Sequence, residues 1–155
     1  MTPKAAYYTP LLHVNSIEAS MRFYALLGFE TVDRMSASGC LYWARMHCEG
    51  GALMFLRAEE PHRPAPKCEV LFAMYTPDLP AFREHLVVNG VEAPPITYPE
   101  YMPSGSLSVT DPDGYMIDIH HWSSDEHEKW ETERKLRLAE PQKPYSKTYC
   151  INGHS

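Results

Sequence analysis

The sequence predicts an α+β fold in which a β-α-β-β-β module occurs twice. Two segments share one order of features: an apolar strand, a polar residue that can cap a helix, a helix of about three turns and a glycine. The stretches Ile17–Gly28 and Leu79–Gly90 have equal lengths, which supports the match. A proline-rich stretch, residues 58–67, separates the halves. We therefore expect two modules, residues 8–57 and 68–122, joined by a linker.

The first module is expected to begin with an apolar strand that runs from Leu11 to the cap residue Ser16. Helical spacing in residues 17–27 places three apolar side chains on one face: Met21, Tyr24 and Leu27. Three strands complete the module, with a tight Gly50-Gly51 turn before the last: Glu30–Arg34, Cys40–Met46 and Ala52–Arg57.

The second module repeats this order. Its first strand is Val70–Tyr75, its cap is Asp78, and its helix covers residues 79–89 with Phe82 and Leu86 on one face. Three strands are expected to follow: Glu92–Thr97, Ser106–Thr110 and Tyr115–His121.

The last two strands form a hairpin around the turn Asp111–Gly114. Pro112 fixes φ and Gly114 accepts a positive φ, so the turn is well specified. Strand alternation places Asp118 on the same face as Met116 and His120, away from the apolar residues between them. An acid on a face that does not pack on a core marks a candidate binding site.

Residues 123–155 form an extension to the domain of residues 1–122. Ser123 and Glu126 can form a capping box at the start of a charged helix, Asp125–Ala139, and residues 143–155 are expected to be irregular. Two interpretations stay open: the helix packs on the body or on a partner subunit, or it is a solvated helix with a frayed end.

Composition limits the class of protein. The 155 residues are 44% hydrophobic with a net charge of −6, which indicates a globular chain and argues against a nucleic-acid backbone as partner. No apolar run is long enough to span a bilayer. The four cysteines form no CxxC pair, so we expect reduced thiols and a cytoplasmic location.

Two motifs carry a resemblance to a known family. Asn15–Glu30 in the first module and Asp111–Ile119 in the second resemble the vicinal oxygen chelate superfamily, which includes glyoxalase I, bleomycin-resistance and fosfomycin-resistance proteins and extradiol dioxygenases. The resemblance covers Tyr8–Trp122. It implies that the mixed sheet curls around a cleft and that the chain forms a homodimer.

In metal-dependent members, ligands lie on the cleft faces of the first and last strands of each module. The resemblance carries these places to Thr9, Met54 or Phe55, Glu69 and Asp118. Thr9 is a poor ligand, and neither Met54 nor Phe55 binds a hard cation, so the first module departs from the pattern. We expect no cofactor. A divalent metal (Zn, Fe, Mn or Ni) is left open through a displaced set: His13, Glu69, Asp118 and His120.

Without a metal, Glu69 and Asp118 are two acids that face one cavity, and they favour a ligand with an amine, a guanidinium or hydrogen-bond donors. In the alternative interpretation, Arg45, Arg57 or Lys67 neutralises them. Further ligand contacts are expected from aromatic residues at the rim and in the loop of residues 94–103: Trp43, Tyr98 and Tyr101. His13 and His120 are candidates too, although each also fits a strand-end histidine.

The sequence therefore predicts a small-molecule-binding protein without the usual metal site, holding an organic, cationic or aromatic ligand in the cleft. It names no catalytic residue. Two alternatives remain: a metal-dependent lyase, isomerase or dioxygenase with a displaced metal site, and a non-catalytic interaction module in which the helix near Trp130 matters most.

Overall fold

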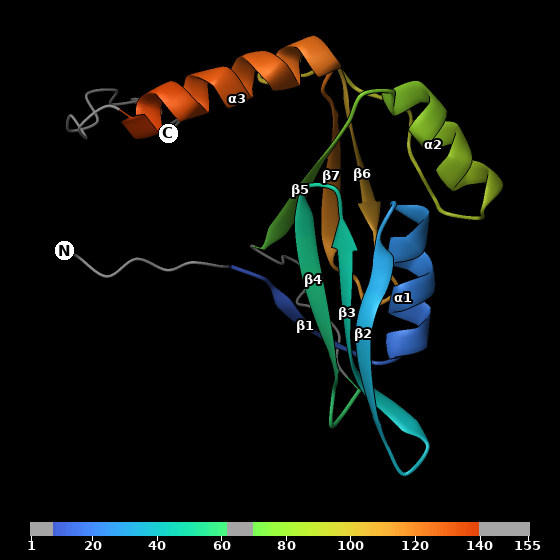
Figure 1. Ribbon diagram of the computed structural model, residues 1–155. Helices are drawn as coiled ribbons and strands as arrows, with labels where there is room; N and C mark the ends of the chain where they lie inside the picture. The colour runs from blue at the N-terminus through green and yellow to red at the C-terminus, as the bar shows by residue number, and fades with distance from the viewer. Residues whose placement is uncertain (1–7, 62–69, 140–155) are drawn as a thin grey trace, which may run out of the picture. The chain divides into compact units, whose positions relative to one another are not determined.

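The structure, a computed structural model, describes residues 8–61 and 70–139. Three helices and seven strands in two mixed sheets lie in these residues, which confirms the predicted α+β class (Figure 1). The chain divides into two compact units, Met1–His121 and Trp122–Ser155. The elements of both predicted modules lie in the first unit, and Trp122, the last residue of the predicted second module, belongs to the second unit.

The first module has the predicted order of elements: β1 (Leu11–Val14), α1 (Ile17–Leu26), β2 (Glu30–Ala37), β3 (Cys40–Cys48) and β4 (Gly51–Arg57). Its sheet runs β1-β4-β3-β2, with β1 parallel to β4 and the other pairs antiparallel. The Ser16 side chain caps α1 by accepting a hydrogen bond from the Ala19 amide. Gly28 ends the helix turn at φ 89°, a conformation that glycine adopts without strain.

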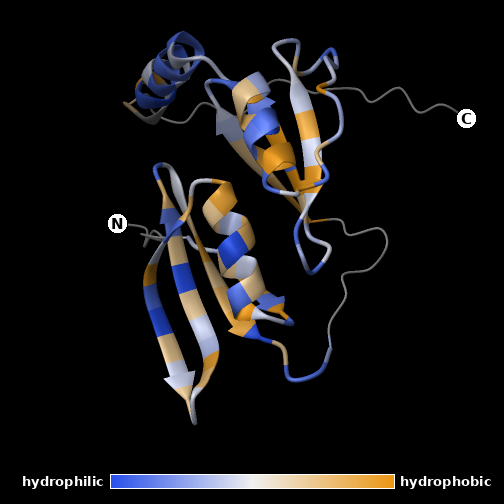
Figure 2. Cartoon of the chain, turned by 90° about the vertical axis from the view of Figure 1, so that its right-hand side faces the viewer, coloured by the Kyte–Doolittle hydropathy of each residue, from blue (hydrophilic) through white to orange (hydrophobic). Residues whose placement is uncertain are grey.

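The core of this module lies between α1 and one face of the sheet. Leu12, Val14 and Phe55 alternate with exposed or half-buried neighbours and point to this face. The ring of Tyr24 on α1 is fully buried and tilts against Phe55 at 5.1 Å between centroids. Figure 2 shows the resulting alternation of hydrophobic and hydrophilic positions along the strands.

The second module contains β5 (Leu71–Thr76), α2 (Leu79–Val88), β6 (Ser106–Thr110) and β7 (Met116–His121). Its sheet runs β5-β7-β6, with β5 parallel to β7. Asp78 caps α2 through the Ala81 amide, as Ser16 caps α1, and Gly90 at φ 81° repeats the role of Gly28. Ile117 and Ile119 are buried, as the alternation predicts.

The predicted strand Glu92–Thr97 is wrong. Within the described residues this segment contributes only an isolated bridge between Thr97 and Ser106. Pro94 and Pro95 supply no N–H donors for a sheet ladder. The Arg83 guanidinium also donates to the carbonyls of Ala93 and Pro94, at 3.0 and 2.7 Å, and so takes acceptors that a strand would need.

The turn between β6 and β7 joins the two modules. Asp113 accepts hydrogen bonds from the Asn15 amide at 2.8 Å and from the Ser20 hydroxyl at 3.4 Å, both in the first module. Asp111 accepts from the Tyr24 hydroxyl at 3.2 Å. Both acids are buried, and burial raises the pKa of Asp111 although the hydrogen bonds that it accepts oppose the shift. Burial together with the Asp111 charge likewise raises the pKa of Tyr24.

The second unit contains α3 (Ser124–Ala139). Its predicted capping box is confirmed: the Ser123 amide donates to the Glu126 carboxylate at 2.8 Å, and the Glu126 amide donates to the Ser123 hydroxyl at 3.3 Å. Trp122, His127 and Trp130 form a ring cluster. Residues 143–155, expected to be irregular, lie outside the described residues. No helix in the described ranges is long and apolar enough to cross a membrane.

Candidate functional site

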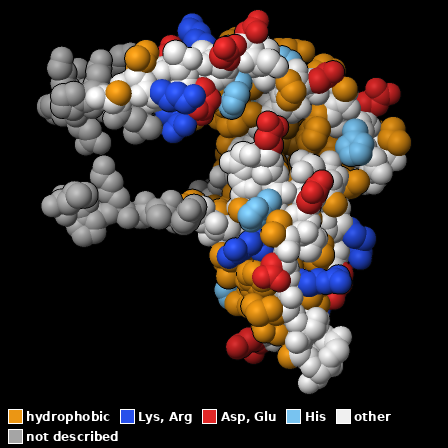
Figure 3. Space-filling model, in the orientation of Figure 1, with side chains coloured by type: hydrophobic (Ala, Val, Ile, Leu, Met, Phe, Trp, Pro, Cys, Tyr) orange, Lys and Arg blue, Asp and Glu red, His pale blue; other side chains and the backbone are white. Residues whose placement is uncertain are grey.

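Within the described residues of the first unit, each sheet has one face on its helix and one face without a covering helix, which we call the open face. On the first sheet, the parallel and antiparallel registers bring β1, β4 and β3 into common rows. Six residues with partly or fully exposed side chains share the open face in these rows: Leu11, His13, Met54, Leu56, Trp43 and Arg45. Figure 3 shows hydrophobic side chains exposed among charged ones over this sheet.

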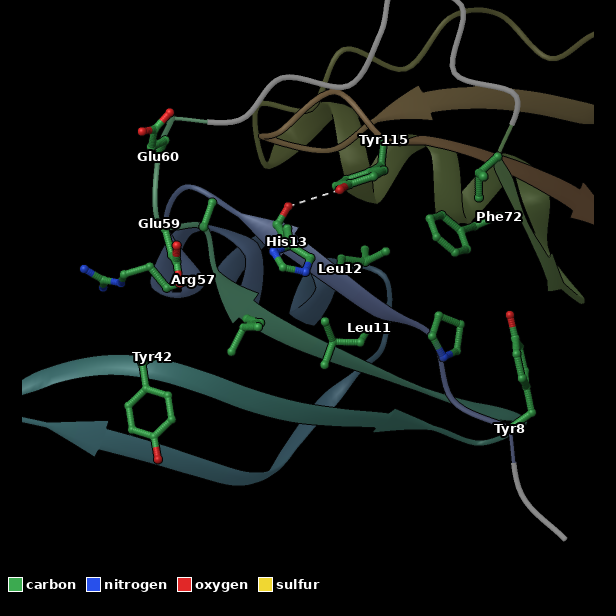
Figure 4. A pocket seen from close by; sticks show the side chains of 14 residues that line it. Tyr8, Leu11, Leu12, His13, Tyr42, Arg57, Glu59, Glu60, Phe72 and Tyr115 are labelled. Atoms are coloured by element: carbon green, nitrogen blue, oxygen red, sulfur yellow. Dashed lines mark hydrogen bonds between the residues drawn. The ribbon is translucent and has the colours of Figure 1, made fainter. Parts of the chain in front are cut away.

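A hollow of about 840 Å³ opens on the first sheet and reaches the second module. Leu11 and His13 on β1 and Leu56 on β4 line one part of it, while Phe72 and Tyr115 line another (Figure 4). The Tyr115 hydroxyl donates to the His13 carbonyl oxygen at 3.1 Å, which connects the two modules at this point. The remaining lining residues are Tyr8, Pro10, Leu12, Tyr42, Arg57, Ala58, Glu59, Glu60 and Val70.

Charges lie at the rim of the hollow. Arg57 forms an ion pair with Glu18 at 3.5 Å, and no ion pair joins it to Asp118. Glu59 and Glu60 are exposed, and Figure 4 shows Arg57 and Glu60 extending away from the centre. The wall is therefore mainly aromatic and aliphatic, with carboxylates at one end.

The predicted site residues do not all meet. His13 lines the hollow, whereas Tyr98 and Tyr101 are exposed in the loop before β6 and do not line it. Trp43 lies on the open face of the first sheet, beneath the Arg45 guanidinium, whose carbon is 5.6 Å from the ring centroid. Glu69 lies outside the described residues.

Asp118 and His120 lie on the open face of the second sheet. The Asp118 carboxylate accepts a hydrogen bond from the Ser108 hydroxyl on β6. His120 is buried rather than placed at an exposed strand end, and its ring lies 5.5 Å from that of Tyr75 between centroids. The sequence of β7 alone reveals neither this burial nor the neighbouring ring on β5.

The first-module residues at the family's metal positions do not fit a metal ion. Phe55 is buried in the core, and Met54 faces the open side, where its sulfur accepts a weak hydrogen bond from Arg45. In the displaced set, the three members that the structure describes, His13, Asp118 and His120, form no cluster. No group of three or more metal-binding side chains occurs in residues 8–61 and 70–139. The fourth member of the displaced set, Glu69, lies outside the described residues.

Several lining residues were missed by the sequence interpretation. Phe72 and Tyr115 come from the second module, and Tyr8 precedes β1. Strand alternation indicates which face of its own sheet a residue occupies, but it carries no information about which residues of another module come near. Nothing in the sequence therefore pointed to these aromatic side chains as a group.

Comparison of the sequence with models of known protein families identifies the family of this chain. The model of the Glyoxalase/Bleomycin resistance protein/Dioxygenase superfamily matches residues 6–119 of the chain. The chain belongs to this superfamily. A search of curated proteins finds no significant match.

Solved structures of the superfamily's fold agree with this assignment. A bleomycin-binding protein complexed with bleomycin is 18% identical with a TM-score of 0.58, over 77% of this chain and 100% of that one. Lactoylglutathione lyase from Agrobacterium tumefaciens is 16% identical with a TM-score of 0.56, over 77% and 96%. An antibiotic-binding protein from a Streptomyces species is 18% identical with a TM-score of 0.55, over 78% and 100%. At these identities the likeness shows the fold.

Proposed function

We propose that this protein binds a flat aromatic organic molecule in the hollow beside β1, without a metal ion. The hollow itself carries this proposal. Its volume of about 840 Å³ lies within the range of small-molecule sites, about 300–1,000 Å³. Its walls combine aromatic and aliphatic side chains with few polar groups, the lining that suits planar ligands. Two proteins of similar fold add support, because one binds bleomycin and the other is an antibiotic-binding protein.

The acids that the structure describes give little support for a positive charge on this ligand. The sequence argument relied on Glu69 and Asp118, and Asp118 already accepts a hydrogen bond from Ser108. The acids at the rim of the hollow are instead Glu59 and Glu60, and both are exposed to solvent. Exposed carboxylates attract a cation only weakly because water screens them.

Titration calorimetry with 2-naphthamide, a neutral two-ring probe, tests the hollow. We expect saturable binding that weakens about tenfold in Phe72→Ala, because one aromatic wall is lost. His13→Ala is a second variant that removes an exposed side chain of the hollow. Because the His13 side chain is exposed, its removal leaves the fold intact, and this variant keeps the test valid if Phe72→Ala unfolds.

Tyr98→Ala is the matched control, because it removes an exposed aromatic side chain outside the hollow. We expect its affinity to stay within about twofold of the wild type. Loss of binding in Tyr98→Ala, with Phe72→Ala and His13→Ala unchanged, would move the site to the loop before β6. Absence of saturable binding in the wild-type protein would contradict the proposal.

We also propose that the chain forms a homodimer. Leu71 and Met116 pair across β5 and β7 on the open face of the second sheet, and they are 48% and 41% exposed. A second copy that covers this face would remove adjacent apolar side chains from water. Light scattering should give twice the chain mass for the wild type and a shift toward one chain mass in Leu71→Asp. A monomeric wild-type protein at micromolar concentration would contradict dimerisation.

A further inference from the structure

Arg45 is a cation with almost no polar partner. It lies near the middle of β3 on the open face of the first sheet and is half-buried. Its Nη2 donates to the Met54 sulfur at 3.5 Å, its Nε is buried without a hydrogen-bond partner, and its guanidinium lies over the Trp43 ring. A thioether is a weak acceptor, so the five N–H donors of this side chain remain largely unused.

No acid neutralises Arg45 within the described residues. The ion pairs there join Arg57 to Glu18 and Arg134 to Glu131. Asp33 lies directly opposite Arg45 on β2, yet its carboxylate accepts the Arg34 amide and forms no ion pair with Arg45. The guanidinium instead extends over Trp43 and toward Met54.

An arginine in this state is unusual because a half-buried donor without an acceptor costs free energy. A buried group that lacks its hydrogen bond costs about 1–3 kcal/mol, and more when it is charged. A carboxylate would relieve this cost, since its two oxygens match the planar fork of the guanidinium. The contact with Met54 would be exchanged for a charge-assisted hydrogen bond.

Arg45 also lies within reach of the hollow. Leu11, which lines the hollow, pairs with Met54, and Met54 pairs with Arg45 on the next strand. Two strand spacings separate Leu11 from Arg45, about 10 Å across the sheet. A two-ring aromatic acid has a length of this order, so its rings can occupy the apolar part of the face while its carboxylate reaches the guanidinium.

We infer that Arg45 is an anion-recognition residue, and that the molecule bound on this face is an aromatic carboxylate rather than a cation. The inference rests on the proposed aromatic site and assigns the charge of its ligand. Trp43 supplies an aromatic surface beside the guanidinium, and Leu11 supplies an apolar one. Arg45 binds and orients the carboxylate and takes part in no chemical step.

Three probes with one aromatic body and different charges test this inference in the wild-type protein: 2-naphthoate, 2-naphthamide and 2-naphthylmethylammonium. We expect naphthoate to bind about tenfold more tightly than the amide, and the ammonium compound to bind most weakly. Raising the salt concentration should weaken binding of naphthoate and leave that of the amide unchanged. These comparisons need no variant, so they hold even where a substitution disturbs folding.

Variants then assign the effect to one residue. Arg45→Gln should reduce naphthoate affinity to that of the amide, and Arg45→Lys should restore only part of it because an ammonium lacks the planar fork. Arg34→Gln is the matched control, since it removes the same charge from an exposed position on the neighbouring strand. It should leave the preference for naphthoate intact.

The outcomes separate the two proposals. If none of the three probes binds, the aromatic site and the anion site both fail. If naphthoate and the amide bind equally and Arg45→Gln changes neither affinity, the aromatic site stands and the anion site is overturned. Tightest binding of the ammonium probe would also overturn the anion site, in favour of the acids at the rim.

Discussion

The two modules share their helices and differ in their sheets. Both α1 and α2 have ten residues, begin after a side-chain cap and end before a glycine with positive φ. Within the described residues, the first module nevertheless builds four strands and the second three. Helix signals act over a few residues and therefore survive in both copies. A strand needs free donors and acceptors along its whole length, and the segment after α2 lacks them.

The modules also differ in the charged residue on the open face. In the second module, the carboxylate of Asp118 has the Ser108 hydroxyl on the adjacent strand as its donor. In the first module, the guanidinium of Arg45 has only a sulfur acceptor and an aromatic ring. A charged side chain that already has a hydrogen-bond partner in the protein gains less free energy from binding a ligand than one that lacks a partner. The comparison favours the first sheet as the place where ligand charge is recognised.

The largest expected effect concerns the hydrogen bonds by which the second module holds the first. Asp111→Ala removes the acceptor for the Tyr24 hydroxyl and for the amides of Asp113 and Tyr115. We expect the free energy of unfolding to fall by about 3 kcal/mol, because these donors stay buried without a partner. Urea denaturation measures the change.

Asp33→Ala is the matched control for this prediction. Asp33 is exposed on β2 and bonds only the amide of the next residue, so its loss should cost less than about 0.5 kcal/mol. Equal destabilisation by the two substitutions would mean that Asp111 contributes no more to stability than a surface acid.

Most of the fold could be predicted because its signals are local. Ser16 and Asp78 as caps, Gly28 and Gly90 as stops, and the turn at Pro112 each act within a few residues. The strand at Glu92–Thr97 was mispredicted because a strand was expected after each helix, although this segment contains two consecutive prolines. The competing contact from Arg83 comes from another element, so no local pattern reveals it.

The second expected effect is a pH dependence. Burial raises the pKa of Asp111 above the ordinary carboxyl value of 3.8, so the folded protein holds its proton at pH values where the unfolded chain has lost it. The protonated form therefore contributes stability that is fully present below about pH 3.8 and is lost as the pH rises through the raised pKa. The Asn side chain in Asp111→Asn keeps an oxygen that can accept hydrogen bonds from the backbone amides, and it cannot titrate.

We expect the stability difference between Asp111→Asn and the wild type to shift in favour of the variant as the pH rises from about 3.8. Urea unfolding at a series of pH values measures this difference. Parallel stability curves would contradict a raised pKa at Asp111, and a shift in the opposite direction would show that the hydrogen bonds from Tyr24 and the backbone outweigh burial.

Less of the site could be predicted than of the fold. His13 was predicted to face the cleft from strand alternation, and it lines the hollow; whether it contacts a ligand stays a prediction. Phe72 and Tyr115 were missed because their position depends on how the second module approaches β1. Arg45 was considered only as a partner for acids. That it has none among the described residues follows from the three-dimensional distances between charges, which a sequence does not contain.

The smallest expected effect tests why the second sheet lacks a strand. Arg83→Met frees the carbonyls of Ala93 and Pro94 and should lower the free energy of unfolding by about 1 kcal/mol, since two hydrogen bonds of a half-buried side chain are lost. Arg22→Met, at an exposed position on α1, is the control.

Replacing Pro94 and Pro95 by valine restores two N–H donors, but in the presence of Arg83 the acceptors stay occupied. We therefore expect slow amide hydrogen exchange at positions 94–96 only when the valines and Arg83→Met are combined. If the valines alone give slow exchange, then proline is the whole reason for the difference between the sheets. If even the combination exchanges fast, β6 offers no pairing beyond Thr97 and Ser106, and the second module is three-stranded because its edge is unsuited to a further strand.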